Sequence, residues 1–209
     1  MVDLPVMLRV HGKRCVVVGG GAVAYRRAKS LLRAGAMVTV VAPKIDGNLR
    51  TVGAQIEQRP YRVGDLDDAM LAVVATNEPE VNETVAQHAA SAGVLVNRAD
   101  LADAGQISFV AHARHGPVTL SVHTGGISAQ AAATILKQLS EDLDPDWERL
   151  LEIVAPYRPL IQQRVEDAGH RHQVLEQLTG PHAIETLKLH GVEALRRFCQ
   201  SLITTPTTQ

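Results

Sequence analysis

Three consecutive glycines near the start of the chain are the residues whose type and spacing most clearly predict a chemical task. Gly19 and Gly21 take the first two positions of the pattern G-x-G-x-x-[GA], and Ala24 takes the third. The first glycine permits a tight turn, the second lets the backbone approach a pyrophosphate, and the small third residue lets a helix pack closely on its strand. The pattern predicts a dinucleotide-binding loop, against the alternative of a glycine turn that binds nothing. The backbone contacts expected with the phosphates come from Gly19, Gly20, Gly21, Ala22 and Val23.

The elements around this loop must hold it at the edge of a sheet, and the sequence predicts such a sheet. Apolar runs typical of buried strands occur at residues 16–18, 37–42, 70–75 and 94–97, and residues 55–60 are predicted to form a shorter strand. Helical patterns follow the glycine loop and cover residues 80–92, so strands and helices alternate. This alternation predicts an α/β fold with a Rossmann-type, doubly wound parallel sheet. Because ligands bind beyond the carboxyl ends of such strands, further cofactor contacts are expected from Pro43, Lys44, Thr76, Asn77 and Asn97.

The end of the second predicted strand lacks the acidic residue that holds the ribose hydroxyls in NAD-binding units. The chain there reads Val41-Ala42-Pro43-Lys44, and the nearest acid is Asp46. Either backbone groups of Pro43 and Lys44 hold the ribose, or the Lys44 ammonium accepts a 2′-phosphate. The sequence leaves both NAD and NADP open.

The pattern changes after about residue 105. Residues 107–111 and 117–123 are predicted to be two strands joined by a polar turn at residues 112–116. The sequence Thr-Gly-Gly-Ile-Ser follows at residues 124–128, and Ser128 is the expected N-cap of the next helix. Backbone donors beside the two glycines suit a substrate carboxylate, although an ordinary strand-to-helix connection explains the same residues equally well. From residue 145 onward the chain is predicted to be helical.

The bulk properties of the 209-residue chain narrow the class of protein. Its 21 basic and 22 acidic residues give a net charge of −1, so neither nucleic acid nor an anionic membrane is an expected partner. No apolar stretch reaches the roughly 18–20 residues that a membrane span needs, and no secretory signal is visible. Cys15 and Cys199 suggest neither a disulfide framework nor a metal set. These features predict a cytoplasmic protein.

Six stretches, in this order, form a combined pattern that is far more specific than any one of them. They are residues 4–6 (Leu-Pro-Val), 18–27 (Val-Gly-Gly-Gly-Ala-Val-Ala-Tyr-Arg-Arg), 38–43 (Val-Thr-Val-Val-Ala-Pro), 75–77 (Ala-Thr-Asn), 96–100 (Val-Asn-Arg-Ala-Asp) and 124–128. In this combination the chain resembles the precorrin-2 dehydrogenases of the siroheme-synthase family over about residues 4–140.

The resemblance implies an architecture and an activity. It implies a homodimer in which residues 1–106 form the Rossmann domain, residues 107–143 the dimerisation and substrate region, and residues 144–209 a helical domain. Members of the family use NAD to oxidise precorrin-2 to sirohydrochlorin, and some also insert ferrous iron to give siroheme. The methyltransferase domain of bifunctional members is not expected in this chain.

The resemblance also implies a catalytic role for Asp100, which follows the fifth predicted strand. Oxidation of a reduced tetrapyrrole transfers a hydride to the nicotinamide and releases protons, so Asp100 is assigned as the general base. From the residue alone, a loop or N-cap aspartate is the favoured interpretation. The chain departs from the family at Arg98 and Ala99, where many members have apolar residues, and Asp103 in the same loop is the alternative base.

The substrate of this family carries eight carboxylates, so the resemblance implies positive charge and hydrogen-bond donors in the substrate site. Each basic residue by itself is better explained as a solvated surface group, and only as a cluster do they fit a substrate site equally well. The histidines lack the partners of a closed zinc site, and no iron ligands are predicted. The expected substrate contacts come from Arg98, His112, Arg114, His115, His123, Thr124, Gly125, Gly126 and Ser128.

Two other classes of protein remain as alternatives. A short-chain dehydrogenase needs a Tyr-x-x-x-Lys pair beside the nicotinamide, and Tyr25 and Lys29 have that spacing. They follow the phosphate loop directly, however, and cannot reach the nicotinamide from there. A non-catalytic sensor that binds NAD through its Rossmann domain is the second alternative, and it leaves Asp100 and the basic residues without a function.

Overall fold

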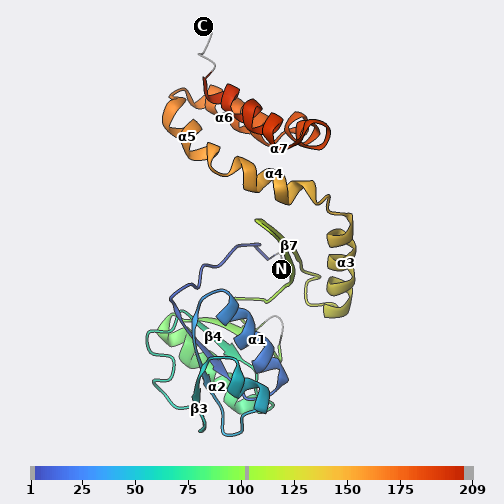
Figure 1. Ribbon diagram of the computed structural model, residues 1–209. Coiled ribbons are helices and arrows are strands. Elements are labelled where there is room, and N and C mark those ends of the chain that lie inside the picture. The colour runs from blue at the N-terminus through green and yellow to red at the C-terminus, as the bar shows by residue number, and fades with distance from the viewer. Residues whose placement is uncertain (1–2, 102–103, 205–209) are drawn as a thin grey trace. The chain divides into compact units, whose positions relative to one another are not determined.

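The computed structural model describes residues 3–101 and 104–204, which fall into two compact units. The first unit spans residues 1–109 and the second spans residues 110–209. Figure 1 shows a sheet flanked by helices in the first unit, and a hairpin followed by helices in the second. The predicted α/β class is therefore confirmed. The three-part division at residues 106 and 143 stays a prediction.

Five parallel strands form the sheet of the first unit in the order β3-β2-β1-β4-β5. The order reverses between β1 and β4, and ligands of such sheets bind at this switch point, beyond the carboxyl ends of the strands. β4 and all but the first residue of β1 are fully buried, which explains their continuous apolar sequences. The strands are β1 (Arg14–Val18), β2 (Met37–Val41), β3 (Gln55–Glu57), β4 (Leu71–Val74) and β5 (Leu95–Arg98).

Helices cover the sheet of the first unit and complete two hydrophobic cores. Helix α1 (Ala22–Arg33) packs Ala24 and Ala28 into one core, and helix α2 (Pro79–Ala92) packs Val85 and Ala89 into the other. Gly93 ends α2 in the left-handed conformation, as its place in the sequence predicted. The two helices thus hold the strand ends in register for a site at the sheet edge.

The second unit begins with an antiparallel hairpin, β6 (Ala111–His115) and β7 (Val118–Val122), packed on helix α3 (Ala129–Asp142). The predicted polar turn at residues 112–116 is wrong, because β6 occupies residues 111–115. The chain turns at Gly116 and Pro117 instead, and Gly116 has a φ of 54°. Two-residue hairpin turns need such a positive φ, which glycine adopts easily. The polar residues before Gly116 therefore belong to a strand.

Within residues 144–204, four further helices follow, and they confirm the predicted helical region. Their inward side chains, including Leu150, Ile161 and Leu195, form a third hydrophobic core. Cys199 is a free thiol buried in this core, and Cys15 is buried in the first unit. Burial raises the pKa of both thiols to about 11, so both stay protonated at neutral pH. The helices are α4 (Asp146–Val154), α5 (Tyr157–Arg164), α6 (Ala168–Leu178) and α7 (Pro181–Thr204).

Candidate functional site

The three positions of the loop between β1 and α1 are occupied by glycine for different structural reasons. Gly19 has a φ of 135°, and a Cβ atom there would collide with the backbone carbonyl of Ala75. A Cβ atom on Gly20 would collide with the carbonyl of Lys44. A Cβ atom on Gly21 would meet nothing within 4 Å. The first two glycines are thus required by the protein's own backbone, whereas Gly21 borders open space at the amino end of α1.

The amino end of α1 carries no competing anion. Gly21 is the N-cap residue, it provides no side-chain hydrogen bond, and no acidic residue occupies the first turn. The N–H groups of that turn and the positive end of the helix dipole therefore face a potential anion. Together with the open space beside Gly21, this arrangement fits a dinucleotide pyrophosphate held by backbone groups of Gly20, Gly21, Ala22 and Val23. Tyr25 and Lys29 lie further along α1, where they contact each other.

The segment after β2 places no free acid at the ribose position. Pro43 and Lys44 are exposed there. The Asp46 carboxylate accepts a hydrogen bond of 2.8 Å from the backbone N–H of Asn48, so it caps the short 3-10 helix Gly47–Thr51. The nearest acid thus has a structural partner, and the contacts predicted from Pro43 and Lys44 remain compatible with the geometry.

The polar residues predicted at the ends of β4 and β5 have separate tasks. The Thr76 hydroxyl donates a hydrogen bond of 2.5 Å to the Oδ1 of Asn82, at the start of α2. Asn77 is exposed in the same loop. Asn97 is buried, and its Nδ2 donates a 2.7 Å hydrogen bond to the carbonyl of Ile107. Its Oδ1 is buried without a hydrogen-bond partner among the residues that the structure describes, and such an acceptor suits a donor from a ligand.

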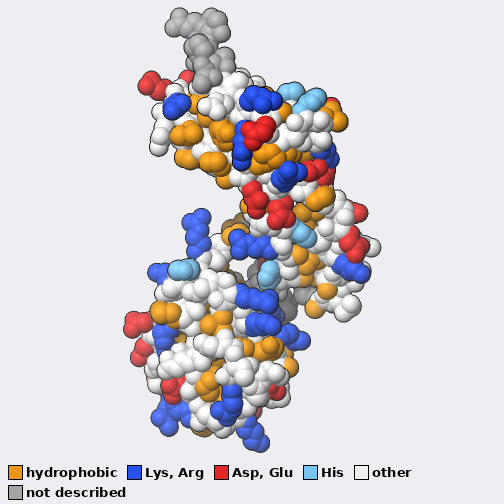
Figure 2. Space-filling model, viewed as in Figure 1, with side chains coloured by type: hydrophobic (Ala, Val, Ile, Leu, Met, Phe, Trp, Pro, Cys, Tyr) orange, Lys and Arg blue, Asp and Glu red, His pale blue; other side chains and the backbone are white. Residues whose placement is uncertain are grey.

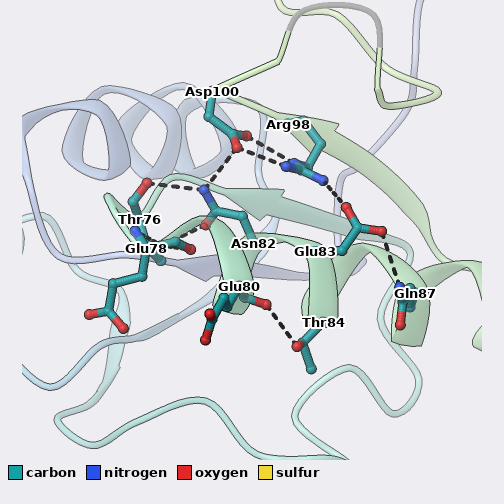
Figure 3. Close-up of polar contacts among 9 residues, drawn as sticks. All are labelled: Thr76, Glu78, Glu80, Asn82, Glu83, Thr84, Gln87, Arg98 and Asp100. Carbon is teal, nitrogen blue, oxygen red and sulfur yellow. Dashed lines mark hydrogen bonds and ion pairs between the residues drawn. The ribbon is translucent and has the colours of Figure 1, made fainter.

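Asp100 lies in a hydrogen-bonded network beyond the end of β5 (Figure 3). Its Oδ1 accepts a hydrogen bond of 2.9 Å from the Nε of Arg98, and its Oδ2 accepts one of 2.8 Å from the Nη2 of the same side chain. The Nδ2 of Asn82 donates a third bond, of 3.0 Å, to Oδ2. Arg98 also binds the Oε2 of Glu83 at 3.0 Å. The network connects β5 to the first turns of α2.

The network sets the charge of Asp100. Hydrogen bonds from Arg98 lower the pKa of the Asp100 carboxyl to about 2, and the bond from Asn82 acts in the same direction, while partial burial opposes both. Asp100 and Glu83 in turn raise the pKa of Arg98. Asp100 is therefore a carboxylate at every physiological pH. Its assignment as a general base stays a prediction, and Asp103 lies outside the residues that the structure describes.

Arg98 differs from its predicted role. Its side chain is only 4% exposed, and its Nε, Nη1 and Nη2 atoms each donate a hydrogen bond to the carboxylates of Asp100 and Glu83. The fork of Nε and Nη2 is thus occupied by Asp100, and burial keeps the rest of the guanidinium from a substrate carboxylate. The correction follows from a contact that the sequence did not reveal, because Glu83 lies on a different element.

The hairpin separates the basic residues that the sequence grouped together. Side chains alternate between the faces of a strand, so His112 and Arg114 lie on the exposed face of β6, while His115 is half-buried on the other. The Nε2 of His115 is buried without a hydrogen-bond partner among the described residues. His123 is exposed just after β7. Two of the four residues are thus placed together on one polar surface.

The turn before α3 has the predicted cap. The Ser128 hydroxyl accepts a 3.0 Å hydrogen bond from the N–H of Ala131, which confirms it as the N-cap residue. The Thr124 hydroxyl binds the backbone of Ser128 and closes the turn. Gly125 and Gly126 both have positive φ, of 60° and 77°. Their contact with a substrate carboxylate stays a prediction.

Three residues of the first unit were missed by the sequence analysis. Asn82 and Glu83 are part of the Asp100 network, and only their positions in the first turns of α2 next to the end of β4 bring them there. Arg27 on α1 has its guanidinium carbon 4.4 Å from the centre of the Phe109 ring. Its Nε is buried without a hydrogen-bond partner among the described residues. The basic run Arg26-Arg27 after the glycine loop was the available signal.

The remaining features of the described residues concern other kinds of site. A cavity of about 620 Å³ lies within the second unit, lined by Tyr157, Leu160, Arg164, Arg196 and four other residues of α4, α5 and α7 together with Pro156. None of the predicted site residues lines it, so it is not the predicted site. Among residues 3–101 and 104–204, no group of three or more potential ligands is arranged for a metal ion. Within the same residues, no helix has the length and apolar character of a membrane span.

Comparison with known proteins connects this geometry to a family. The family model described as "Putative NAD(P)-binding" matches residues 6–111. Siroheme synthases of Pseudomonas entomophila and Chromobacterium violaceum are 32% and 34% identical to the chain, over 96% and 92% of its length. These alignments include only 44% and 42% of the two relatives, so the chain spans less than half of their length.

A solved structure covers the chain more fully. The protein described as "SirC, precorrin-2 dehydrogenase" is 26% identical in sequence and has a TM-score of 0.74. The match includes 95% of this chain and 99% of that one. The prediction of a nicotinamide dinucleotide cofactor is thus confirmed at the level of NAD(P). The chain belongs to this NAD(P)-binding family, and its predicted relationship to the siroheme synthases and precorrin-2 dehydrogenases is confirmed.

Proposed function

We propose that the protein oxidises precorrin-2 to sirohydrochlorin with NAD, as a step of siroheme biosynthesis. The observation that carries the proposal is the pairing of an open glycine loop after β1 with Asp100 after β5, two strands away, both beyond the carboxyl ends of their strands. Likeness to a precorrin-2 dehydrogenase along almost the whole of both chains supports the choice of substrate.

Different residues of the chain have different proposed roles in this reaction. When bound, NAD supplies the acceptor for the hydride that leaves the tetrapyrrole. The amides around Gly21 hold the pyrophosphate, and Asn77 and the backbone of Pro43 and Lys44 are the proposed contacts further along the cofactor. Asp100 provides a negative charge near the carboxyl ends of β4 and β5.

Unpaired cations support a polyanionic substrate. Arg27 has no carboxylate partner among the described residues, and burial lowers its pKa, with the neighbouring charge of Arg26 adding to that effect. A guanidinium stacked on Phe109 is held ready for a carboxylate. On β6, His112 and Arg114 present a second basic surface. We assign substrate carboxylates to these groups and to the turn of Thr124, Gly125, Gly126 and Ser128.

The proposal includes a homodimer and a cytoplasmic location. Ile135 and Leu139, one helical turn apart on α3, are 41% and 47% exposed, and Ile127 before the helix is 88% exposed. Figure 2 shows hydrophobic side chains among polar ones on the surface of this part of the chain. Exposed apolar residues on successive turns of one helix support the proposal that α3 contributes to an interface. Free, buried thiols agree with a reducing compartment.

Incubation with precorrin-2 and NAD tests the activity. We expect the absorption spectrum of sirohydrochlorin to appear together with that of NADH, and a parallel incubation with NADP measures the cofactor preference. Gly21→Asp is the control, because its side chain and charge would occupy the pyrophosphate position and abolish cofactor binding. A protein that binds NAD and leaves precorrin-2 unchanged would be a sensor instead.

Insertion of ferrous iron is the second activity in the proposal. It is measured as siroheme formed from sirohydrochlorin and ferrous iron, with and without the protein. A rate no greater than that of the uncatalysed reaction would restrict the protein to the dehydrogenase step.

A further inference from the structure

We infer that Arg98 is a positioning residue that holds Asp100 as a fixed anion, and that the proton released during oxidation goes to water and not to Asp100. The inference rests on the proposed dehydrogenase function and specifies the role of its central carboxylate. It changes the assignment of Asp100 from a base to a source of electrostatic stabilisation.

The first argument is the use of the carboxylate oxygens. The fork of Arg98 binds both of them, at 2.9 and 2.8 Å, and Asn82 adds a third donor at 3.0 Å. Charge-assisted, two-pronged pairs of this kind are among the strongest in proteins. A proton on either oxygen would remove the negative charge that strengthens both arms of the fork. Proton transfer to Asp100 therefore opposes the geometry that places it.

The second argument is the support behind Arg98. Its side chain is 4% exposed, and the Oε2 of Glu83 holds it from α2 at 3.0 Å. The other oxygen of Glu83 accepts a hydrogen bond of 3.1 Å from Gln87, so both of its carboxylate oxygens have a partner (Figure 3). Asp100 and Glu83 together share one guanidinium, which leaves one net negative charge in the cluster. Among the described residues, the charged group that contacts Asp100 is Arg98 from β5, and the other charged group that contacts Arg98 is Glu83 from α2.

The third argument is the chemistry of the step. Oxidation removes a hydride from a ring carbon, and the two electrons of that bond go to NAD. The macrocycle then carries one additional positive charge until a ring proton leaves to water. A preorganised carboxylate stabilises this charge without accepting a proton. A carboxylate with a pKa of about 2 is a weak acceptor at neutral pH, where the best bases have a pKa near the working pH.

The charge of Asp100 can be tested without substrate or cofactor. The ¹³C carboxyl resonances of aspartate are followed in the full chain between about pH 3 and 8, a range that includes the ordinary pKa of aspartate, and Asp100→Asn identifies the resonance of Asp100. We expect no titration of Asp100 in this range in the parent protein, and a midpoint higher by about 1–3 pH units in Arg98→Met. Titration of the parent Asp100 at or above the ordinary pKa of aspartate overturns the inference, whatever the protein does with precorrin-2.

The direction of the rate change in Arg98→Met separates the two roles. If Asp100 were the base, loss of Arg98 would make it a stronger one and turnover would rise. As a fixed anion it loses its position, and turnover falls by roughly 10–100-fold. NAD affinity stays unchanged. An equal or faster rate overturns the inference. Arg98→Lys keeps the charge without the fork, and we expect an intermediate rate from it even if Arg98→Met folds poorly.

The first unit contains a matched control. Arg59 forms a second two-pronged pair with Asp65, at 2.9 and 2.7 Å. This pair follows β3, which is the outer strand on the side of the sheet opposite to β5. Arg59→Met removes a similar guanidinium from a similar carboxylate. It should leave both the titration of Asp100 and the turnover as in the parent. A change of the same size in both variants would reduce the Arg98 effect to general destabilisation and overturn the inference.

Discussion

The sheet of the first unit and the hairpin with α3 in the second bury their apolar residues to very different extents. β4 is entirely buried, and the sheet has a hydrophobic core on each face. Within residues 110–143, all of which the structure describes, Ala132 is the one buried hydrophobic residue. A two-stranded hairpin is marginal without a further apolar surface to pack on. The comparison indicates that the sheet is stabilised by its own two cores, whereas the hairpin and α3 leave most of their apolar side chains partly or fully exposed.

Two leucine-to-alanine substitutions, one in each region, test this difference in burial with the largest expected effect. Leu71 is fully buried in β4, and Leu71→Ala should lower the free energy of unfolding by about 2–5 kcal/mol through lost burial and a residual cavity. Leu139→Ala removes the same atoms from an exposed position, so we expect a change within about 0.5 kcal/mol in the monomer. Urea unfolding at low protein concentration measures both. Equal losses would contradict the difference between the two regions.

A second pair separates packing from cofactor binding within the glycine loop. Gly20→Ala places a methyl group against the carbonyl of Lys44, and we expect a loss of about 1–3 kcal/mol in the free energy of unfolding. Gly21→Ala meets no protein atom and should leave stability nearly unchanged. It should weaken NAD binding, because the methyl group borders the proposed pyrophosphate position. Calorimetric titration with NAD measures the binding effect, and thermal unfolding measures the stability effect. Full NAD affinity in Gly21→Ala would show that the pyrophosphate does not lie at this position.

The polar network of the first unit predicts a pH-dependent contribution to stability. The folded-state pKa of Asp100, about 2, is lower than its ordinary value of 3.8. Its contribution is therefore complete above about pH 4 and is lost as the pH falls toward 2. Asp100→Asn should lower the free energy of unfolding by on the order of 1–2 kcal/mol at pH 7, and the difference should shrink below pH 4. Urea unfolding of both proteins across this range measures it, and a difference that persists at low pH would refute the ionic origin.

The smallest expected effect on monomer stability belongs to the surface of α3. Ile135→Glu introduces a charge at an exposed apolar position, so the unfolding of the isolated chain should change by less than about 0.5 kcal/mol. If α3 forms the dimer contact, the same substitution should weaken self-association at least roughly tenfold, because an unpaired charge is buried there. Sedimentation equilibrium measures the association, and Lys137→Glu on the exposed surface of the same helix is the control. Undiminished association would place the contact elsewhere.

The sequence was sufficient where local patterns decide the structure. The spacing of Gly19, Gly21 and Ala24 predicted the loop between β1 and α1, and the confirmed cap at Ser128 was equally visible. In both cases a few adjacent residues determine which backbone groups need partners. Strand existence and the α/β class followed from apolar runs for the same reason. The turn of the hairpin was misplaced, because polar residues of a half-exposed strand look like a loop.

Only the tertiary structure decided what the polar side chains contact. The sequence indicated Arg98 as a substrate ligand, yet Glu83 lies fifteen positions away and reaches it only because α2 packs beside β5. That packing buries the guanidinium, and a buried charge needs carboxylate partners. The sequence by itself therefore determined the dinucleotide-binding fold and its glycine loop. The ionised state of Asp100 and the unpaired surface of α3 were decided by how distant elements meet, because burial and charge pairing depend on neighbours in space.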